Sequence, residues 1–154
     1  MYTFVLAVHN LVRWVALFLG IFAIVRSVSG WLGRREWSQA DRKVGVFFTS
    51  AMDVQLLLGL WLYFFLSPIT RTALGNFAAS DFGAAMGDPF ARFFALEHAL
   101  YMLLAVVFAH LGSLLPKKVS ESRAKYQRAA IFFILAGAAL LIGMPWTGSP
   151  LPSF

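Results

Sequence analysis

The chain has 154 residues, of which 60% are hydrophobic and only 13% are charged, and it contains no Cys. A soluble domain carries about 25% charged residues to keep its surface hydrated, so this composition indicates an integral membrane protein. The lack of Cys excludes disulfide frameworks, zinc–cysteine sites and Cys nucleophiles. The net charge of +6 does not indicate a nucleic-acid partner, because the basic residues fall in two short clusters between long apolar segments.

Four apolar segments have about the 20 residues that cross a bilayer, and they cover residues 3–28, 44–66, 90–115 and 126–144. They must be helices, because the backbone has to satisfy its own hydrogen bonds in lipid. Signals for helix ends agree with these limits, namely Ser67-Pro68, Asp88-Pro89, Pro116 and Pro145. Since short connections favour antiparallel neighbours, residues 1–154 are predicted to form a single all-α domain, a membrane-spanning up-down four-helix bundle.

The basic residues predict the orientation of this bundle. Residues 29–43 and 116–125 each contain four Lys or Arg, whereas residues 67–88 contain only Arg71. Short basic connections stay on the cytoplasmic side, so both termini and residues 67–88 are expected on the outer side. Residues 67–88 either cap a site that opens outward or form a glycine-rich linker without a role.

Two His residues lie at similar depth in helices that run in the same direction. At 1.5 Å per residue, His9 is about 9 Å and His98 about 12 Å below the outer ends of the first and third segments. These helices lie diagonally in an up-down bundle, so two imidazoles that meet there leave space for a flat cofactor, and bis-histidine haem b is the candidate. The alternative is that both His form hydrogen bonds in a polar core and bind nothing. His110 is expected about 30 Å down, near the inner interface, where it needs no special partner.

Further polar residues are candidates for support of this site. Arg92, one turn nearer the outer surface, is expected to pair with a haem propionate. Met102, one turn below His98, packs on the ring or competes as an axial ligand. An ion pair between Arg13 and Glu97 is the least costly way to bury both charges, either as support for the site or as a purely structural contact.

Asp53 lies near the middle of the second segment, where an isolated carboxylate takes up a proton before it stays charged. It is expected to share Arg13, to carry protons or to contact a quinone. Gln55 is two positions further on, about 200° around the helix, so Asp53 and Gln55 cannot face one partner. One of them is therefore expected to face a neighbouring helix or subunit.

The segments His9-Asn10-Leu11-Val12-Arg13-Trp14, Gln55 to Leu60, Arg92 to His98 and Pro145-Trp146 resemble one family. It comprises small bacterial four-helix membrane proteins labelled cytochrome b-like or uncharacterised. The resemblance implies the bacterial inner membrane and points to His9, Arg13, Gln55, Arg92, Glu97 and His98 as site residues. Relatives often carry a His where this chain has Asp53, which would weaken haem binding here if that His were an axial ligand.

The leading hypothesis is a b-type cytochrome-like electron-transfer protein with haem between the first and third helices. It would be at most an electron-transfer component rather than an enzyme in its own right, and its partners would be lipid, a quinone, a larger redox complex or a second copy. One alternative is a cofactor-free accessory or structural subunit of a larger membrane complex. Another is a proton or small-solute conductor that uses Asp53, His9 and His98.

Overall fold

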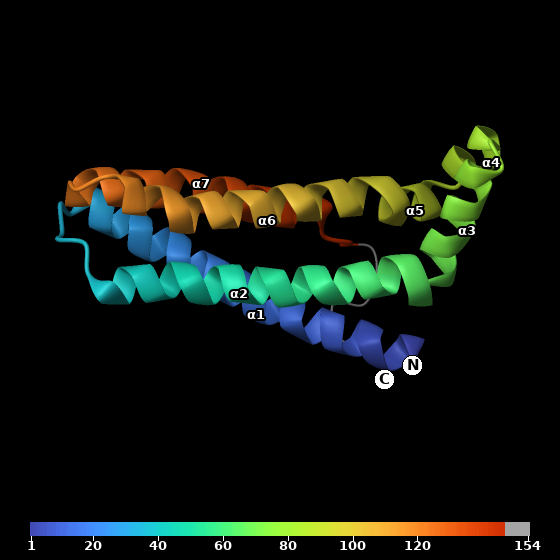
Figure 1. Ribbon diagram of the computed structural model, residues 1–154, viewed down its shortest axis with the longest axis horizontal. Helices are drawn as coiled ribbons and strands as arrows, with labels where there is room; N and C mark the ends of the chain where they lie inside the picture. Colours follow the sequence, from blue (N-terminus) through green and yellow to red (C-terminus); the bar gives the residue numbers. More distant parts are fainter. Residues whose placement is uncertain (147–154) are drawn as a thin grey trace.

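The computed structural model describes residues 1–146, and the regular structure in that range is entirely helical (Figure 1). The first long segment is α1 (Tyr2–Leu32), and the second joins α2 (Gln39–Trp61) to the π-helix η1 (Leu62–Leu66). The third comprises α5 (Pro89–Arg92), the π-helix η2 (Phe93–Glu97), α6 (His98–Leu114) and the 3₁₀ turn η3 (Leu115–Lys118), and the fourth is α7 (Ser122–Gly143). All four are long and apolar enough to span a membrane, as the sequence predicts.

The long helices pack as a ring of antiparallel neighbours. α1 contacts α2 and α7, and α6 also contacts α2 and α7 (Figure 1). α1 and α6 therefore lie across the diagonal of the bundle. The sequence-based prediction of an up-down four-helix arrangement is confirmed, and the diagonal is the feature on which the candidate site depends.

Local signals explain where the helices begin. Ser38 caps α2 in a capping box, in which the Ser38 hydroxyl accepts from the Asp41 amide and the Asp41 carboxylate accepts from the Ser38 amide. Asp88 caps α5 by accepting from the Phe90 amide, with Pro89 in the first turn. These boundaries agree with the sequence prediction, although the helices extend beyond the purely apolar stretches at their basic ends.

The interior of the bundle is built mainly from small side chains. Large apolar residues such as Phe18, Leu57 and Phe65 point outward and are about two-thirds exposed or more, at 70%, 67% and 68%. Lipid gives large side chains no reason to turn inward, so close backbone approach at small residues drives the packing. The buried cluster accordingly contains Ala16, Ala23, Ala105, Ala109, Ala129, Ala136 and Ala139, with Phe48, Met52, Phe133 and Leu140 between them.

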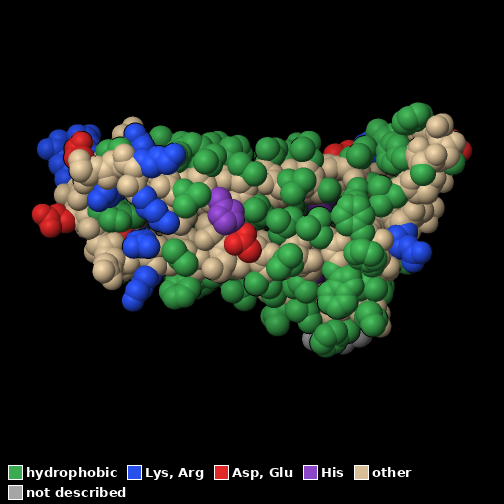
Figure 2. Space-filling view, viewed as in Figure 1, with side chains coloured by type: hydrophobic (Ala, Val, Ile, Leu, Met, Phe, Trp, Pro, Cys, Tyr) green, Lys and Arg blue, Asp and Glu red, His purple; other side chains and the backbone are tan. Residues whose placement is uncertain are grey.

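The two ends of the bundle differ in charge. Figure 2 shows Lys and Arg gathered at the end where α1 joins α2 and α6 joins α7, with a largely hydrophobic surface beyond it. At this end the buried Asp41 carboxylate accepts from Arg26 Nε at 2.6 Å and from the Tyr126 hydroxyl at 2.8 Å. Tyr126 also packs on Trp37, with ring centres 4.8 Å apart. This network ties α1, α2 and α7 together; the sequence analysis did not identify it.

The connection between the second and third segments is more ordered than the sequence suggested. It forms α3 (Pro68–Ala78) and α4 (Phe82–Gly87), each begun by a side-chain cap, from Ser67 and Asp81 respectively. Thr70 donates to the Tyr63 carbonyl at 2.8 Å, which fixes the start of α3 against the end of η1. Capped helical turns therefore satisfy the backbone of this connection, and Ile69 and Thr70 at the start of α3 line the first of the cavities described below.

Candidate functional site

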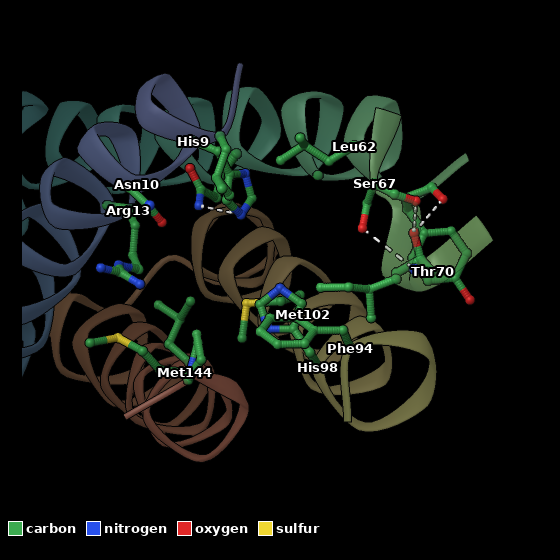
Figure 3. A pocket seen from close by; sticks show the side chains of 18 of the residues that line it. His9, Asn10, Arg13, Leu62, Ser67, Thr70, Phe94, His98, Met102 and Met144 are labelled. Atoms are coloured by element: carbon green, nitrogen blue, oxygen red, sulfur yellow. Dashed lines mark hydrogen bonds between the residues drawn. The ribbon is translucent and has the colours of Figure 1, made fainter. Parts of the chain in front are cut away.

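His9 and His98 face each other across the bundle. His9 comes from α1 and His98 from the first position of α6, and their ring centres are 6.5 Å apart with the planes at 68° (Figure 3). Neither ring is turned outward to the lipid side. The predicted approach of the two imidazoles at one depth is thus present in the structure.

Each imidazole is oriented by one polar neighbour. His98 Nδ1 lies 2.7 Å from the carbonyl oxygen of Gly143 on α7. A carbonyl can only accept, so this nitrogen donates, and a neutral His98 then carries its lone pair on Nε2. His9 Nε2 lies 3.2 Å from the side-chain nitrogen of Gln55 on α2. Gln55 is buried and points inward to His9.

Buried polar atoms near the pair have no hydrogen-bond partner within the described part of the chain. They include His9 Nδ1 and Gln55 Oε1, and Glu97 Oε2 lies nearby on the same segment as His98. An unsatisfied buried polar group costs about 1–3 kcal/mol, so a group of them calls for an explanation such as an absent ligand. The orphaned atoms of His9 and Gln55 lie at the cavities described next.

Two cavities adjoin the imidazoles. Their volumes are about 240 and 280 Å³, and both are lined by His9, Gln55, Gly59, Tyr63, His98 and Met102. The first extends toward α3, where Thr70 lines it, and toward the end of α7, where Met144 lines it (Figure 3). The second extends between α2 and α6 past Phe64 and Leu103. Free space thus adjoins the His pair in more than one direction, with walls that are mainly aromatic and aliphatic, as in typical cofactor sites.

Gly59 lies closest to the His9 ring among the glycines of α2. A Cβ at this position would lie 3.3 Å from His9 Cε1, tighter than ordinary van der Waals contact. Because Gly59 has no side chain, the His9 ring can occupy its position beside the cavity without a close contact to α2. Met102 also lines both cavities, one turn from His98, as the sequence predicts.

The charged residues are arranged differently from the prediction. Glu97 Oε1 accepts from Arg92 Nε at 3.0 Å, so the predicted ion pair of Glu97 with Arg13 is wrong. Arg92 is not among the described residues that line either cavity, whereas Arg13 lines the first and lies 5.5 Å from the Trp14 ring centre. Arg13 is therefore the only Lys or Arg among the described residues that line these two cavities.

Asp53 has a partner that the sequence analysis missed. Its Oδ1 lies 2.8 Å from His110 Nε2, across the contact of α2 with α6, and both side chains are nearly half exposed. The expectations that Asp53 shares Arg13 and that His110 needs no partner are wrong. The inference that Asp53 and Gln55 face opposite ways is confirmed, since Gln55 contacts His9. The conductor hypothesis requires Asp53 and the His9–His98 pair to line one cavity. Among the described residues, Asp53 lines neither of the two cavities at the His pair.

Comparisons with protein-family models, with curated proteins and with solved structures find no match. The functional argument therefore depends on the geometry of the site itself.

Proposed function

We propose that the chain is a membrane b-type cytochrome-like electron-transfer protein, with haem b held between α1 and α6 by His9 and His98. The observation that carries the proposal is the 6.5 Å separation of the two imidazole centres across the bundle diagonal. A bond from a metal to a His nitrogen is about 2 Å long and the ring centre lies roughly 1 Å further on, so two axial imidazoles have centres roughly 6 Å apart.

The cavities and the orphaned polar atoms support the same assignment. A flat ring between the imidazoles needs space on either side of the line that joins them, and two cavities adjoin the pair. His9 Nδ1 is buried without a hydrogen bond, and it would bind iron if the Gln55 amide presents its oxygen, which is likewise unpartnered, to accept from His9 Nε2–H. Haem would supply one-electron chemistry at its iron when bound.

The residues of this chain would hold and tune that group. The Gly143 carbonyl fixes the His98 tautomer so that Nε2 points away from α7, and such hydrogen bonds raise the basicity of a ligating His. Gln55 orients His9 from α2. Arg13 lines the first cavity and would therefore pair with a propionate in place of Arg92. The apolar walls would exclude water and so influence the reduction potential.

The visible absorption spectrum of the purified, haem-supplied protein tests the proposal. We expect a Soret band, one haem per chain, and loss or a marked shift of the band in His98→Ala and in His9→Ala. His110→Ala is the matched control, because His110 also lies within the bundle segments but hydrogen-bonds to Asp53 outside the cavities. Added imidazole is expected to restore the band of His98→Ala by occupying the vacated position.

Two results would overturn the assignment. One is a folded protein that takes up no haem, which is the outcome expected of a cofactor-free accessory subunit. The other is a band that responds equally to His98→Ala and His110→Ala, because this would place the iron elsewhere.

A further inference from the structure

The Asp53–His110 pair is unusual because of the surface in which it lies. Figure 2 shows a purple His side chain beside a red acidic one on a largely hydrophobic part of the surface, just beyond the Lys and Arg side chains of the basic end. The Asp53 side chain is 48% exposed and that of His110 is 42% exposed. Asp53 is 14 residues from the start of α2, about 21 Å along the helix, so the pair lies near the centre of the spanning segment.

The described surroundings of the pair on this face are mainly apolar, with Ser50, one turn from Asp53 on α2, as an exposed polar residue. Large apolar residues of α2 and α6 are exposed around it, among them Val54, Leu57, Val107 and Leu114. Lipid chains cannot hydrogen-bond, and ionisable residues at this depth usually face a protein interior or a polar cavity. Among the described residues the pair makes one hydrogen bond, between His110 Nε2 and Asp53 Oδ1, which leaves one carboxylate oxygen and one ring nitrogen available to a group that covers this face.

We propose that the face formed by α2 and α6 around Asp53 and His110 is a dimer interface with a second copy of this chain. The two copies are related by a two-fold axis along the membrane normal. His110 of each copy then lies beside Asp53 of the other, and with both imidazoles protonated one N–H of each His110 donates to Asp53 of its own copy and the other N–H donates to Asp53 of the second copy.

A second copy fits this face because the face complements itself. It carries one acceptor and one donor side by side, and a two-fold interface brings each group onto its counterpart in the other copy. Every copy has the same basic connections and so the same orientation in the membrane, which places the two pairs at one depth without adjustment. Any other covering group would have to supply both a donor and an acceptor at that depth.

Cysteine cross-linking in proteoliposomes tests the position of the interface, and the natural chain contains no Cys that would interfere. On mixing and oxidation, a chain with Val107→Cys on α6 is expected to form a disulfide with a chain that carries Leu57→Cys on α2, because the two-fold axis places α6 of one copy against α2 of the other. Val107 and Leu57 are 51% and 67% exposed and lie one turn from His110 and Asp53 toward the same end of the bundle. In the control, a chain with Ile21→Cys on α1, which is 61% exposed on the helix diagonal to α6, replaces the Val107→Cys chain. Equal cross-linking in both mixtures, or in the control alone, would overturn the proposal.

Charge exchange tests the role of the pair itself. Asp53→His leaves one chain with two His, and His110→Asp leaves another with two Asp. Fluorescence energy transfer on mixing these two chains is expected to show a heterodimer preferred over either homodimer by about tenfold or more, as two interhelical hydrogen-bonded contacts per interface would provide. Replacing both residues by Leu is expected to weaken dimerisation of the folded protein about tenfold.

A monomeric natural chain at high density in the bilayer, or random pairing of the exchanged chains, would contradict the proposal. The first result would indicate that a lipid-soluble small molecule or a different subunit covers the face. Helicity measured by circular dichroism shows that each variant is folded, and the readout does not involve the cavities at His9 and His98.

Discussion

The close approach of α6 to α7 at Gly112 allows a quantitative prediction about packing. Gly112 of α6 lies against Phe133 of α7, and a Cβ on Gly112 would come within 2.5 Å of two ring carbons of Phe133. Phe133 is 2% exposed and also packs edge-on against Phe48, with ring centres 5.6 Å apart, so its ring has little room to move. Overpacking of this kind costs about 1–3 kcal/mol, and the change from Gly to Ala in a helix gains about 1 kcal/mol. Gly112→Ala is therefore expected to lower the free energy of unfolding by about 1–2 kcal/mol, because a contact at 2.5 Å lies at the costly end of that range.

The same substitution at Gly75 is the matched control. Gly75 is in the interior of α3, and no described atom lies within 4 Å of its potential Cβ. Gly75→Ala should therefore stabilise the protein by up to about 1 kcal/mol through helix propensity alone. Both variants can be measured by SDS titration in mixed micelles, followed by Trp fluorescence.

A double-mutant cycle isolates the contact between Gly112 and Phe133. Phe133→Leu removes the ring that the new methyl group would meet, so the double variant should lose clearly less stability than the sum of the single variants. Additive losses, or a Gly112→Ala variant as stable as the natural chain, would refute the packing argument.

Two further predictions concern the basic end and the topology. Asp41→Asn removes the charge that Arg26 approaches at 2.6 Å, so it is expected to lower the free energy of unfolding by about 1–3 kcal/mol. Asp81→Asn, at an exposed helix cap, is the control and should change the free energy of unfolding by no more than about 0.5 kcal/mol. Equal losses in the two variants would contradict the buried network. In intact cells, a membrane-impermeant maleimide should label Gly83→Cys directly but Ser120→Cys only after permeabilisation, and the reverse pattern would refute the outward placement of residues 67–88.

The fold could be predicted from the sequence because its signals are local. Segment length and apolar content predict the four long helices, and Ser67, Asp88 and the prolines that follow them predict two of the boundaries. The opposite directions of Asp53 and Gln55 follow from helix geometry alone. Each of these inferences concerns one helix at a time.

The partners of the polar residues could not be predicted in the same way. Counting from residue 90 gives the depth of His110, and the limits of the second segment give that of Asp53, but neither gives the register of one helix against the other. The structure brings them within 2.8 Å because α2 packs directly on α6. The network of Asp41, Trp37 and Tyr126 could not be predicted either, because only the fold brings residues about 85 positions apart in the sequence into contact.

The error over Glu97 has a specific physical cause. The sequence analysis treated residues 90–115 as a regular α-helix, in which residues three or four apart share a face. Residues Phe93–Glu97 instead form a π-helical turn, whose hydrogen bonds join residues five apart. Arg92 and Glu97 are five apart, and their side chains meet at 3.0 Å.

This turn also affects the candidate site, since His98 follows it directly. A π-helical turn accommodates an extra residue, so it changes the direction in which all later side chains of the helix point relative to Phe90. Such turns occur frequently at functional sites, and a second one, Leu62–Leu66, ends the α2 segment beside the same cavities, where Leu62 and Tyr63 line the first. The orientation of His98 toward His9 is therefore set jointly by the turn before it and by the Gly143 carbonyl, neither of which is encoded in the hydrophobic pattern.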